Sequence, residues 1–352
     1  MMLGSKGQKA VHACMIRLLN LRPAKHEQAA KADFECPLYC LEKWCKIEEG
    51  ENLKNELYQS CTLCPRECHA DRLSGKKGAC GENSVLRVGR AALHMWEEPC
   101  ISGTRGSGTV FFSGCSLGCI FCQNRELSYG GLGKEISEER LAEIFLELQE
   151  KGAANINLVT GEHFVPGILE GLTLAKEQGL TLPVVYNSSG YEKPETIRLL
   201  KGSVDIWLPD FKYWDDELGL RFSGVADYRE RAIKAIDEMV CQTGACVFDE
   251  EGYLRKGVVV RHLLLPGHVK NSREVLRYLH DTYGNRIYIS IMSQYTPLSK
   301  ELPFEELNRK VTRREYERLL DYALELGIEN GFFQEGEAAK ESFIPDFNGE
   351  GV

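Results

Sequence analysis

Three cysteines follow one another at the spacing C-x3-C-x2-C in the first half of the chain. The three cysteines follow shortly after the apolar run 110–112 and are Cys115, Cys119 and Cys122. Small residues such as Gly118 lie between them. Such residues let a loop turn tightly, so that several sulfur atoms can face one centre. We therefore expect a ligand-binding loop at the end of a strand, and this feature constrains the fold more than any other.

The number of cysteines narrows the kind of ligand. Thiolates favour zinc, copper(I) and iron–sulfur clusters, and structural zinc usually takes four protein ligands. After Cys122, no further cysteine occurs before Cys241 and no histidine before His163. A cluster of four irons held by three thiolates would leave one iron open to a substrate or cofactor. Three buried cysteines without a metal are the simpler alternative.

The motif, with Phe121 directly before its last cysteine, resembles the signature of the radical S-adenosylmethionine (SAM) superfamily. The stretch 91–124 is similar to the branch of that superfamily named after pyruvate formate-lyase activating enzymes. The resemblance implies a [4Fe-4S] cluster on Cys115, Cys119 and Cys122. It also implies that the open iron chelates SAM, and that SAM is reductively cleaved to a 5′-deoxyadenosyl radical. An electron donor such as flavodoxin or ferredoxin would be a partner.

A second group of cysteines precedes the first. Cys61, Cys64, Cys68 and Cys80 have the spacing C-x2-C-x3-C-x11-C, with proline and glycine turns around them. Four thiolates on loops predict a closed site, which would hold either zinc or a second iron–sulfur cluster. Free cysteines in a loop are the alternative. Metal binding would supply folding energy to a segment with few apolar residues.

Composition limits the class of protein. The 352 residues are 43% hydrophobic and 27% charged, as in soluble globular proteins. The net charge of −9 argues against nucleic-acid binding, which needs a basic face. The 14 cysteines come without a convincing signal peptide or membrane-spanning run. We therefore expect a cytoplasmic protein with metal-bound thiolates and no membrane partner. Such a protein would be oxygen-sensitive and would act under anaerobic conditions.

Strand and helix patterns alternate after the cysteine motif. Repeated strand-then-helix units predict parallel strands with right-handed crossovers. Six such units fit an α/β fold of the incomplete (β/α)6 barrel type, which the resemblance also implies, whereas an open doubly wound sheet is the alternative. The expected strands are 109–114, 155–160, 182–187, 203–208, 256–264 and 286–291, with helices near 137–150, 165–178, 193–201, 228–240, 271–282 and 312–326. Residues 331–334 would close one edge of the sheet.

The remaining segments complete the predicted organisation. Helical patterning occurs at 12–20, and Cys36, Cys40 and Cys45 are interpreted as packing or incidental thiols. The segments 87–90 and 91–96 predict a short strand pair. The expected divisions are an N-terminal extension (1–57), a cysteine-rich region with connector (58–108), a partial barrel (109–335) and a C-terminal tail (336–352).

Polar residues follow the expected strands, and in parallel barrels chemistry gathers at these strand ends. The resemblance implies that Gly161 and Glu162, a partial version of a G-G-E-P element, hold the amino group of SAM. Asn187 and Ser189 could bond a ribose or a carboxylate, although such residues are also common in turns.

The next two strand ends carry charge. Asp210 and Lys212 form a D-x-K element that resembles the SAM-binding pair of glycyl-radical-activating enzymes, and two residues apart they share one face of an extended chain. His262 belongs to an R-H-x-x-x-P-G pattern also found in those enzymes, and it points away from the face of Arg261.

Three functions remain open at this stage. The first is a radical SAM enzyme that activates a glycyl radical enzyme, and the second is the same chemistry on a peptide or small metabolite. The third is a non-enzymatic metal-binding module that binds a partner. In the first two, no side chain is assigned a certain catalytic role, because the cofactor supplies the difficult chemistry.

Overall fold

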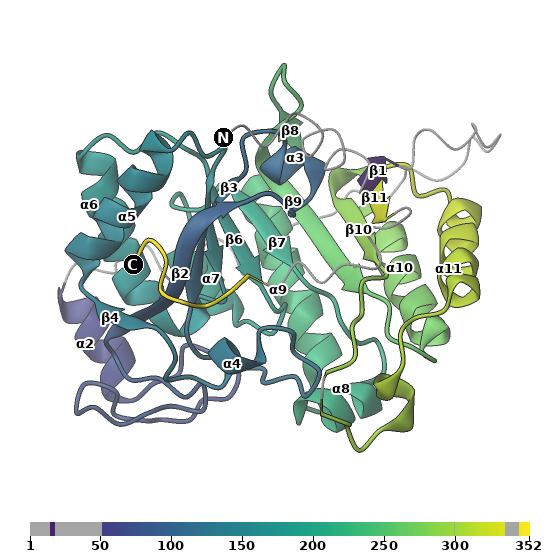
Figure 1. Cartoon of the computed structure of the whole chain (residues 1–352), viewed down its shortest axis with the longest axis horizontal. Helices are drawn as coiled ribbons and strands as arrows, with labels where there is room; N and C mark the ends of the chain where they lie inside the picture. The colour runs from purple at the N-terminus through teal and green to yellow at the C-terminus, as the bar shows by residue number, and fades with distance from the viewer. Residues whose placement is uncertain (1–14, 18–50, 299, 335–344) are drawn as a thin grey trace, which may run out of the picture.

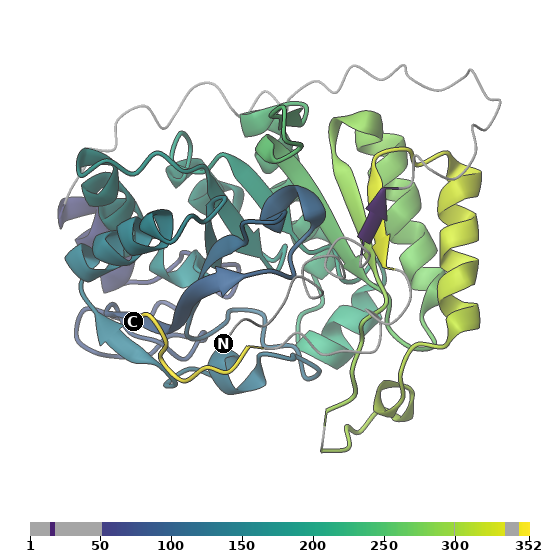
Figure 2. The ribbon, with the colours of Figure 1, turned by 45° about the horizontal axis from the view of Figure 1, so that its top comes forward.

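The computed structural model describes residues 15–17, 51–298, 300–334 and 345–352. These residues form one long, mostly parallel sheet with helices packed around it (Figures 1 and 2). The predictions for Cys36, Cys40 and Cys45 lie outside the described residues, as does most of the predicted N-terminal extension. Within the described ranges, no helix is long and apolar enough to cross a membrane.

Seven neighbouring strands run parallel and form the centre of the sheet. Their order in space follows their order in the chain. The six strands predicted from the sequence are present, and 331–334 adds a seventh at the edge where closure was expected. The strands are β3 (Ser107–Phe112), β5 (Ile156–Val159), β6 (Val184–Ser188), β7 (Ile206–Pro209), β9 (Leu254–Leu263), β10 (Tyr288–Met292) and β11 (Gly331–Gln334).

The connector before the cysteine motif forms a single strand, β2 (Leu86–His94). The strand pair predicted within 87–96 is therefore wrong, because residues 88–94 pair antiparallel with β3 as parts of one strand. The register of this pairing shifts around Gly89, where a Cβ would lie 2.5 Å from the Leu127 side chain. Strand β2 belongs to the same sheet as the parallel strands, so the connector is part of the main fold.

Short strands complete the sheet. The helix predicted at 12–20 is wrong at its centre, because the three residues of β1 (Met15–Arg17) pair antiparallel with the edge strand β11. At the opposite edge, β4 (Lys134–Ile136) pairs antiparallel with β2. A further strand, β8 (Val247–Phe248), pairs with β9. Pairing with an open edge outweighs local helical pattern here, since it satisfies the free amides and carbonyls of the edge strand.

Helices link the parallel strands and cover the sheet; α5 and α6 lie at one end, and α10 and α11 lie at the other (Figure 1). Their ends carry ordinary capping signals. Thr312 and Glu315 form a capping box at the start of α11, and Gly327 ends it in the left-handed conformation. The helices are α2 (Glu51–Gln59), α3 (Pro99–Ser102), α4 (Arg125–Ser128), α5 (Glu138–Glu150), α6 (Val165–Glu177), α7 (Pro194–Leu199), α8 (Asp216–Ser223), α9 (Tyr228–Thr243), α10 (Val269–Tyr283) and α11 (Arg313–Leu326), with 3-10 turns η3 (Glu162–Phe164), η4 (Gly284–Arg286) and η5 (Glu305–Asn308).

The last eight residues return to the middle of the fold and lie along β2 (Figure 1). The amide of Ala91 donates to the carbonyl of Glu350 at 2.8 Å. The ring of Phe347 packs edge-on against Phe111, with 5.4 Å between the ring centres. This segment therefore reaches β3 next to the cysteine motif.

Candidate active site

The carboxyl ends of the parallel strands meet at one edge of the sheet, where a cavity of about 260 Å³ lies. In parallel α/β folds, residues that follow the strands gather at this edge. Six of the parallel strands contribute residues at or near their carboxyl ends to the lining of the cavity. These residues are Cys115, Cys119 and Cys122 after β3, Thr160 after β5, Asn187 and Ser189 at the end of β6, Asp210 and Lys212 after β7, Leu263 in β9, and Met292 and Gln294 at the end of β10.

The loop with the three cysteines leaves β3 through Gly114, whose φ is +83°. A Cβ at this position would lie 2.6 Å from the carbonyl oxygen of Cys80 and 2.8 Å from Cγ of Glu82. Only glycine lets the loop pass so close to these groups. Beyond this turn, Cys119 accepts a hydrogen bond from Ser223 Oγ at 3.1 Å. The turn therefore directs the cysteine loop into the cavity.

The surroundings of the three sulfur atoms fit an iron–sulfur cluster. Burial, reinforced by the neighbouring Cys119, raises the pKa of the Cys115 thiol to about 12. Burial and the neighbouring Cys119 also raise the pKa of the Cys122 thiol, and the nearby cation of Lys212 opposes that rise, as it would favour the negative charge of a thiolate-bound cluster. In the described part of the chain, no three His, Cys, Asp or Glu side chains meet closely enough to hold a single metal ion. Cluster binding would therefore draw the sulfurs together.

Asp210 and Lys212 form an ion pair on the wall of the cavity, so the two side chains share one face, as their spacing predicted. Burial opposes the charge of Lys212, but Asp210 and the nearby Cys119 raise its pKa above the usual range. The lysine is therefore a fixed cation beside the cysteine loop. Together the two side chains offer one positive and one negative group to a zwitterionic ligand.

Tyr228 joins the ends of β6 and β7, a contact that the sequence analysis missed. Its hydroxyl donates to the carbonyl of Ser189 at 2.8 Å, and it accepts from the amide of Lys212 at 2.9 Å. Gly190 makes this close approach possible, since its φ is +76° and a Cβ would lie 2.0 Å from the carbonyl oxygen of Asp210. A glycine three residues after the end of the predicted strand 182–187 was the available signal for this contact.

Three predicted site residues do not line the cavity. Gly161 packs against Ile168, and the buried carboxylate of Glu162 accepts a hydrogen bond from Ser116 Oγ at 2.8 Å. His262 is also buried, with Nδ1 2.6 Å from the carbonyl oxygen of Phe211. The cavity is lined instead by their neighbours Thr160 and Arg261.

The physical reason for these displacements is local. Thr160 has a φ of +58°, and the 3-10 turn that follows carries Glu162 away from the strand end. Burial and the neighbouring Glu192 raise the pKa of Glu162 well above its usual range. The alternation of side chains along β9 sends adjacent residues to opposite faces, and the structure gives the interior face to Arg261.

The sequence did not predict the buried ionic group on the cavity wall, which Arg261 forms with Glu97 and Glu98. Arg261 donates from Nε to Glu98 Oε1 at 2.8 Å and also forms an ion pair with Glu97. Asn157 donates to Glu97 at 3.0 Å, which holds that carboxylate from a second side. Although burial opposes ionisation, Arg261 keeps the pKa of Glu97 below its usual range. The two consecutive glutamates before Pro99 were the only sequence signal for this group.

The second cysteine group lies directly against the loop of the first. The amide of Cys115 donates to the carbonyl of Cys80 at 3.2 Å. Arg66, two residues after Cys64, donates to the carbonyl of Ser116 at 2.9 Å. None of the four predicted ligands of the second group lines the cavity. The two groups are therefore neighbours, and only the first faces the cavity.

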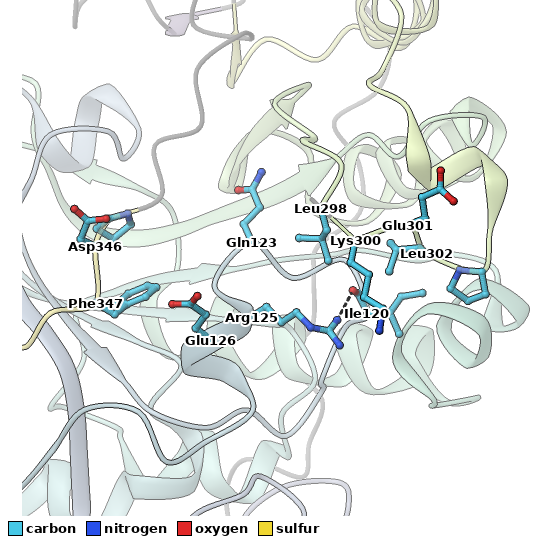
Figure 3. Close-up of a pocket in the computed structure, with 12 residues that line it drawn as sticks. Ile120, Gln123, Arg125, Glu126, Leu298, Lys300, Glu301, Leu302, Asp346 and Phe347 are labelled. Atoms are coloured by element: carbon cyan, nitrogen blue, oxygen red, sulfur yellow. Dashed lines mark hydrogen bonds between the residues drawn. The ribbon is translucent and has the colours of Figure 1, made fainter.

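A wider groove of about 610 Å³ adjoins the cavity and shares Gln123 and Pro345 with it. Figure 3 shows that its residues come from the cysteine loop with α4, from Leu298 and residues 300–303, and from the C-terminal segment. Arg125 is fixed at one side by a hydrogen bond of 2.9 Å to the carbonyl of Ile120 (Figure 3). The groove presents charges of both signs next to apolar side chains, and it leads to the cysteine loop.

The chain is similar to several known proteins. The radical SAM superfamily matches residues 109–241. An uncharacterized protein of Methanocaldococcus jannaschii is 29% identical over 79% of this chain and 77% of its own length. A pyruvate formate-lyase-activating enzyme of Clostridium pasteurianum is 31% identical over 50% of this chain and 68% of its own length. Among solved structures, a radical SAM methyltransferase from Sphaerobacter thermophilus has a TM-score of 0.46 at 16% identity, covering 65% of this chain and 67% of its own.

Proposed function

Because the chain belongs to the radical SAM superfamily, we propose that it cleaves SAM reductively and abstracts a hydrogen atom from a polypeptide. The observation that carries the proposal is the shared lining of one cavity. Cys115, Cys119 and Cys122 line it together with Asp210 and Lys212. Three thiolates leave one iron open, and the ion pair stands beside them.

Each part of the lining has a distinct role in this proposal. The three cysteines hold the [4Fe-4S] cluster, and the Asp210–Lys212 pair binds the amino-acid part of SAM through its opposite charges. Asn187 and Ser189 offer hydrogen bonds to the remaining polar groups of SAM. When bound, the cluster and SAM supply the one-electron chemistry, and the chain positions the substrate and excludes water.

The groove supports a polypeptide as substrate. It is more than twice the volume of the cavity and opens onto it at Gln123 and Pro345. An extended segment in the groove would place one residue near the cysteine loop while its neighbours contact Lys300 and Glu301. The similarity to the activating enzyme of Clostridium pasteurianum supports a more specific candidate, a glycine of a partner enzyme.

The direct test is anaerobic reconstitution with iron and sulfide, followed by addition of SAM and a chemical reductant. The proposal predicts 5′-deoxyadenosine and methionine in equal amounts. A protein with an intact cluster that leaves SAM uncleaved would contradict it. Reduced flavodoxin or ferredoxin in place of the chemical reductant would identify the electron donor.

The substrate class needs a separate test. An extract of cells grown on α-deuterated glycine is divided by size, and each fraction is incubated with the reconstituted enzyme and SAM. Deuterium in 5′-deoxyadenosine from the protein fraction supports glycyl-radical formation. Stimulation by the small-molecule fraction alone would favour a metabolite substrate. The polar wall of Glu97, Glu98 and Arg261 is the feature of the cavity that favours this second candidate.

A further inference from the structure

A buried cation lies inside the second cysteine group. Arg72 is fully buried, and its guanidinium carbon is 4.4 Å from the ring centre of Tyr58. Its nitrogen atoms donate to the main-chain oxygen of Asn83 at 3.1 Å and to that of His163 at 2.5 Å. Nη1 is also 3.7 Å from Sγ of Cys61, which is a hydrogen-bonding distance for sulfur.

The charge of Arg72 has no carboxylate partner among the residues that the structure describes; its hydrogen bonds there go to main-chain oxygens and to sulfur. The nearby groups able to carry negative charge are the phenol of Tyr58 and the sulfurs of Cys61 and Cys80. A phenol ionises only near pH 10 in water. An uncompensated buried cation strongly destabilises a fold, so the sulfurs of Cys61 and Cys80 are the groups that can balance the charge of Arg72.

The fold brings two of the four sulfurs together, and metal binding would draw the other two toward them. The amide of His69 donates to the carbonyl of Cys61 at 3.0 Å, which turns the C-x2-C-x3-C loop back on itself. A Cβ on Gly78 would lie 3.2 Å from Sγ of Cys68 and 3.5 Å from Sγ of Cys80. These two sulfurs therefore lie close to one point, although they are far apart in the sequence.

This region has little else to stabilise it. From the end of α2 at Gln59 to the start of β2 at Leu86, the chain forms no helix or strand. Its small apolar cluster consists of Tyr58, Cys61 and Leu63, with Leu57 and Leu199 packed against it. A bound metal supplies folding energy to segments of this kind.

From these observations we propose that Cys61, Cys64, Cys68 and Cys80 bind a metal as four thiolates, with Arg72 as the buried counter-cation. Four thiolates around a zinc ion, or around a [4Fe-4S] cluster in its oxidised resting state, give a net charge of about −2. The guanidinium offsets part of that charge and donates to one of the ligands. The same residues serve either metal, so metal analysis decides between zinc and iron.

The proposed centre also supports the loop that lines the cavity. The carbonyl of Cys80 receives the amide of Cys115, and Arg66 holds the carbonyls of Ser116 and Leu117 at 2.9 and 3.2 Å. A metal that fixes Cys64 and Cys80 therefore fixes both contacts. We expect loss of this metal to reduce iron uptake at the first cysteine group as well.

The first experiment separates the two groups. The full-length triple variant Cys115→Ala, Cys119→Ala, Cys122→Ala is purified without oxygen and analysed for zinc, iron and sulfide. We expect about one zinc, or about four irons with matching sulfide, per chain. Adding Cys64→Ser and Cys80→Ser should remove that metal. A triple variant that keeps its circular dichroism spectrum but holds neither metal would refute the site. Because this variant lacks the first cysteine group, the result is independent of SAM cleavage.

The second experiment tests the cation. In the triple-variant background, Arg72→Met should lower metal affinity about 10–100-fold, as loss of outer-shell partners does, measured by competition with a chelator. Arg72→Lys keeps the charge and should lose less. Lys77→Met is the matched control, since it removes an exposed cation from the same loop. Equal affinity in Arg72→Met and Lys77→Met would refute the role of Arg72.

Discussion

The two cysteine groups touch each other, yet their surroundings differ. Cys115, Cys119 and Cys122 line a cavity beside the cation of Lys212 and the polar ends of β6 and β7. The second group lies behind that loop, away from the cavity, and has Arg72 within it. Three ligands facing a cavity can leave a metal open to another molecule, whereas four ligands without a cavity give a closed centre. In the two proposals, access to the cavity therefore distinguishes the reactive centre from the structural one.

The strongest test of this comparison is removal of one ligand of the first group. Cys119→Ala should abolish SAM cleavage, because the cluster loses one of its three protein ligands. The measurement is 5′-deoxyadenosine formation after reconstitution. Cys246→Ala is the control, since its half-buried thiol lies outside both groups and donates to the carbonyl of Val258. Unchanged cleavage by Cys119→Ala would remove the first group from the active site.

A smaller effect is expected from the ion pair on the cavity wall. Lys212→Met should raise the KM for SAM about 10–100-fold, as loss of a charged contact of about 1.5–3 kcal/mol implies, when the variant and the wild-type protein are compared at matched iron content. The double variant Asp210→Asn, Lys212→Met removes both charges of the pair. If the pair only stabilises the fold, the double variant should recover a normal KM. If the pair binds SAM, the KM should remain high.

The close approach of β6 and β7 allows a comparison between two glycines. Gly190→Ala should destabilise the protein by about 2–4 kcal/mol, because the new Cβ meets the carbonyl of Asp210 at a left-handed residue. Gly202 has a similar φ of +80° but open space around it, so Gly202→Ala should cost only about 1 kcal/mol. Urea unfolding of the two variants measures the difference. Equal losses would show that strand-end packing contributes nothing beyond backbone conformation.

The smallest effect concerns a histidine between the two groups. The carbonyl of His163 accepts a hydrogen bond from Arg72, and the ring atom Nε2 of His163 lies 2.7 Å from the carbonyl oxygen of Ser113. Burial, together with Arg72, lowers its pKa to about 3. The folded protein therefore keeps the His163 imidazole neutral, whereas the unfolded chain binds a proton on it below about pH 6.5. As the pH falls below that value, protonation stabilises only the unfolded state, and the free energy of unfolding decreases.

The replacement His163→Gln should flatten this dependence. Between about pH 7 and pH 5, the wild-type protein should lose about 2 kcal/mol more unfolding free energy than the variant. Urea titrations at both pH values give the comparison, and His280→Gln serves as the control on the outer helix α10. If the unfolding free energy of the variant depends on pH as strongly as that of the wild-type protein, His163 is not the group responsible for the pH dependence.

The sequence predicted the parallel strands well, because short apolar runs between helical patterns leave few alternatives. It failed where pairing partners decide the outcome. The residues of β1 have helical periodicity, but they pair with the edge of β11, and the two halves of 87–96 join into one strand along β3. A local sequence pattern carries no information about the free hydrogen-bonding groups of an edge strand that is distant in the sequence.

The site was predicted in part for similar reasons. Four predicted residues lie at or just after the ends of their strands, so they reach the expected edge: Asn187, Ser189, Asp210 and Lys212. Glu162 and His262 were assigned by motif, but a 3-10 turn and the choice of strand face direct them elsewhere. The wall made by Glu97, Glu98 and Arg261 joins residues more than 160 positions apart, so no local spacing could show it.

The sequence by itself determined the chemistry available to this protein: three closely spaced thiols, four more upstream, and a strand order that brings polar residues to one edge. These depend on residue identity and on short-range spacing. The tertiary structure alone decided which thiols face the cavity, which of two adjacent residues lines it, and that Arg72 lies beside Cys61. The physical reason is that access, burial and charge compensation arise only when distant segments pack together.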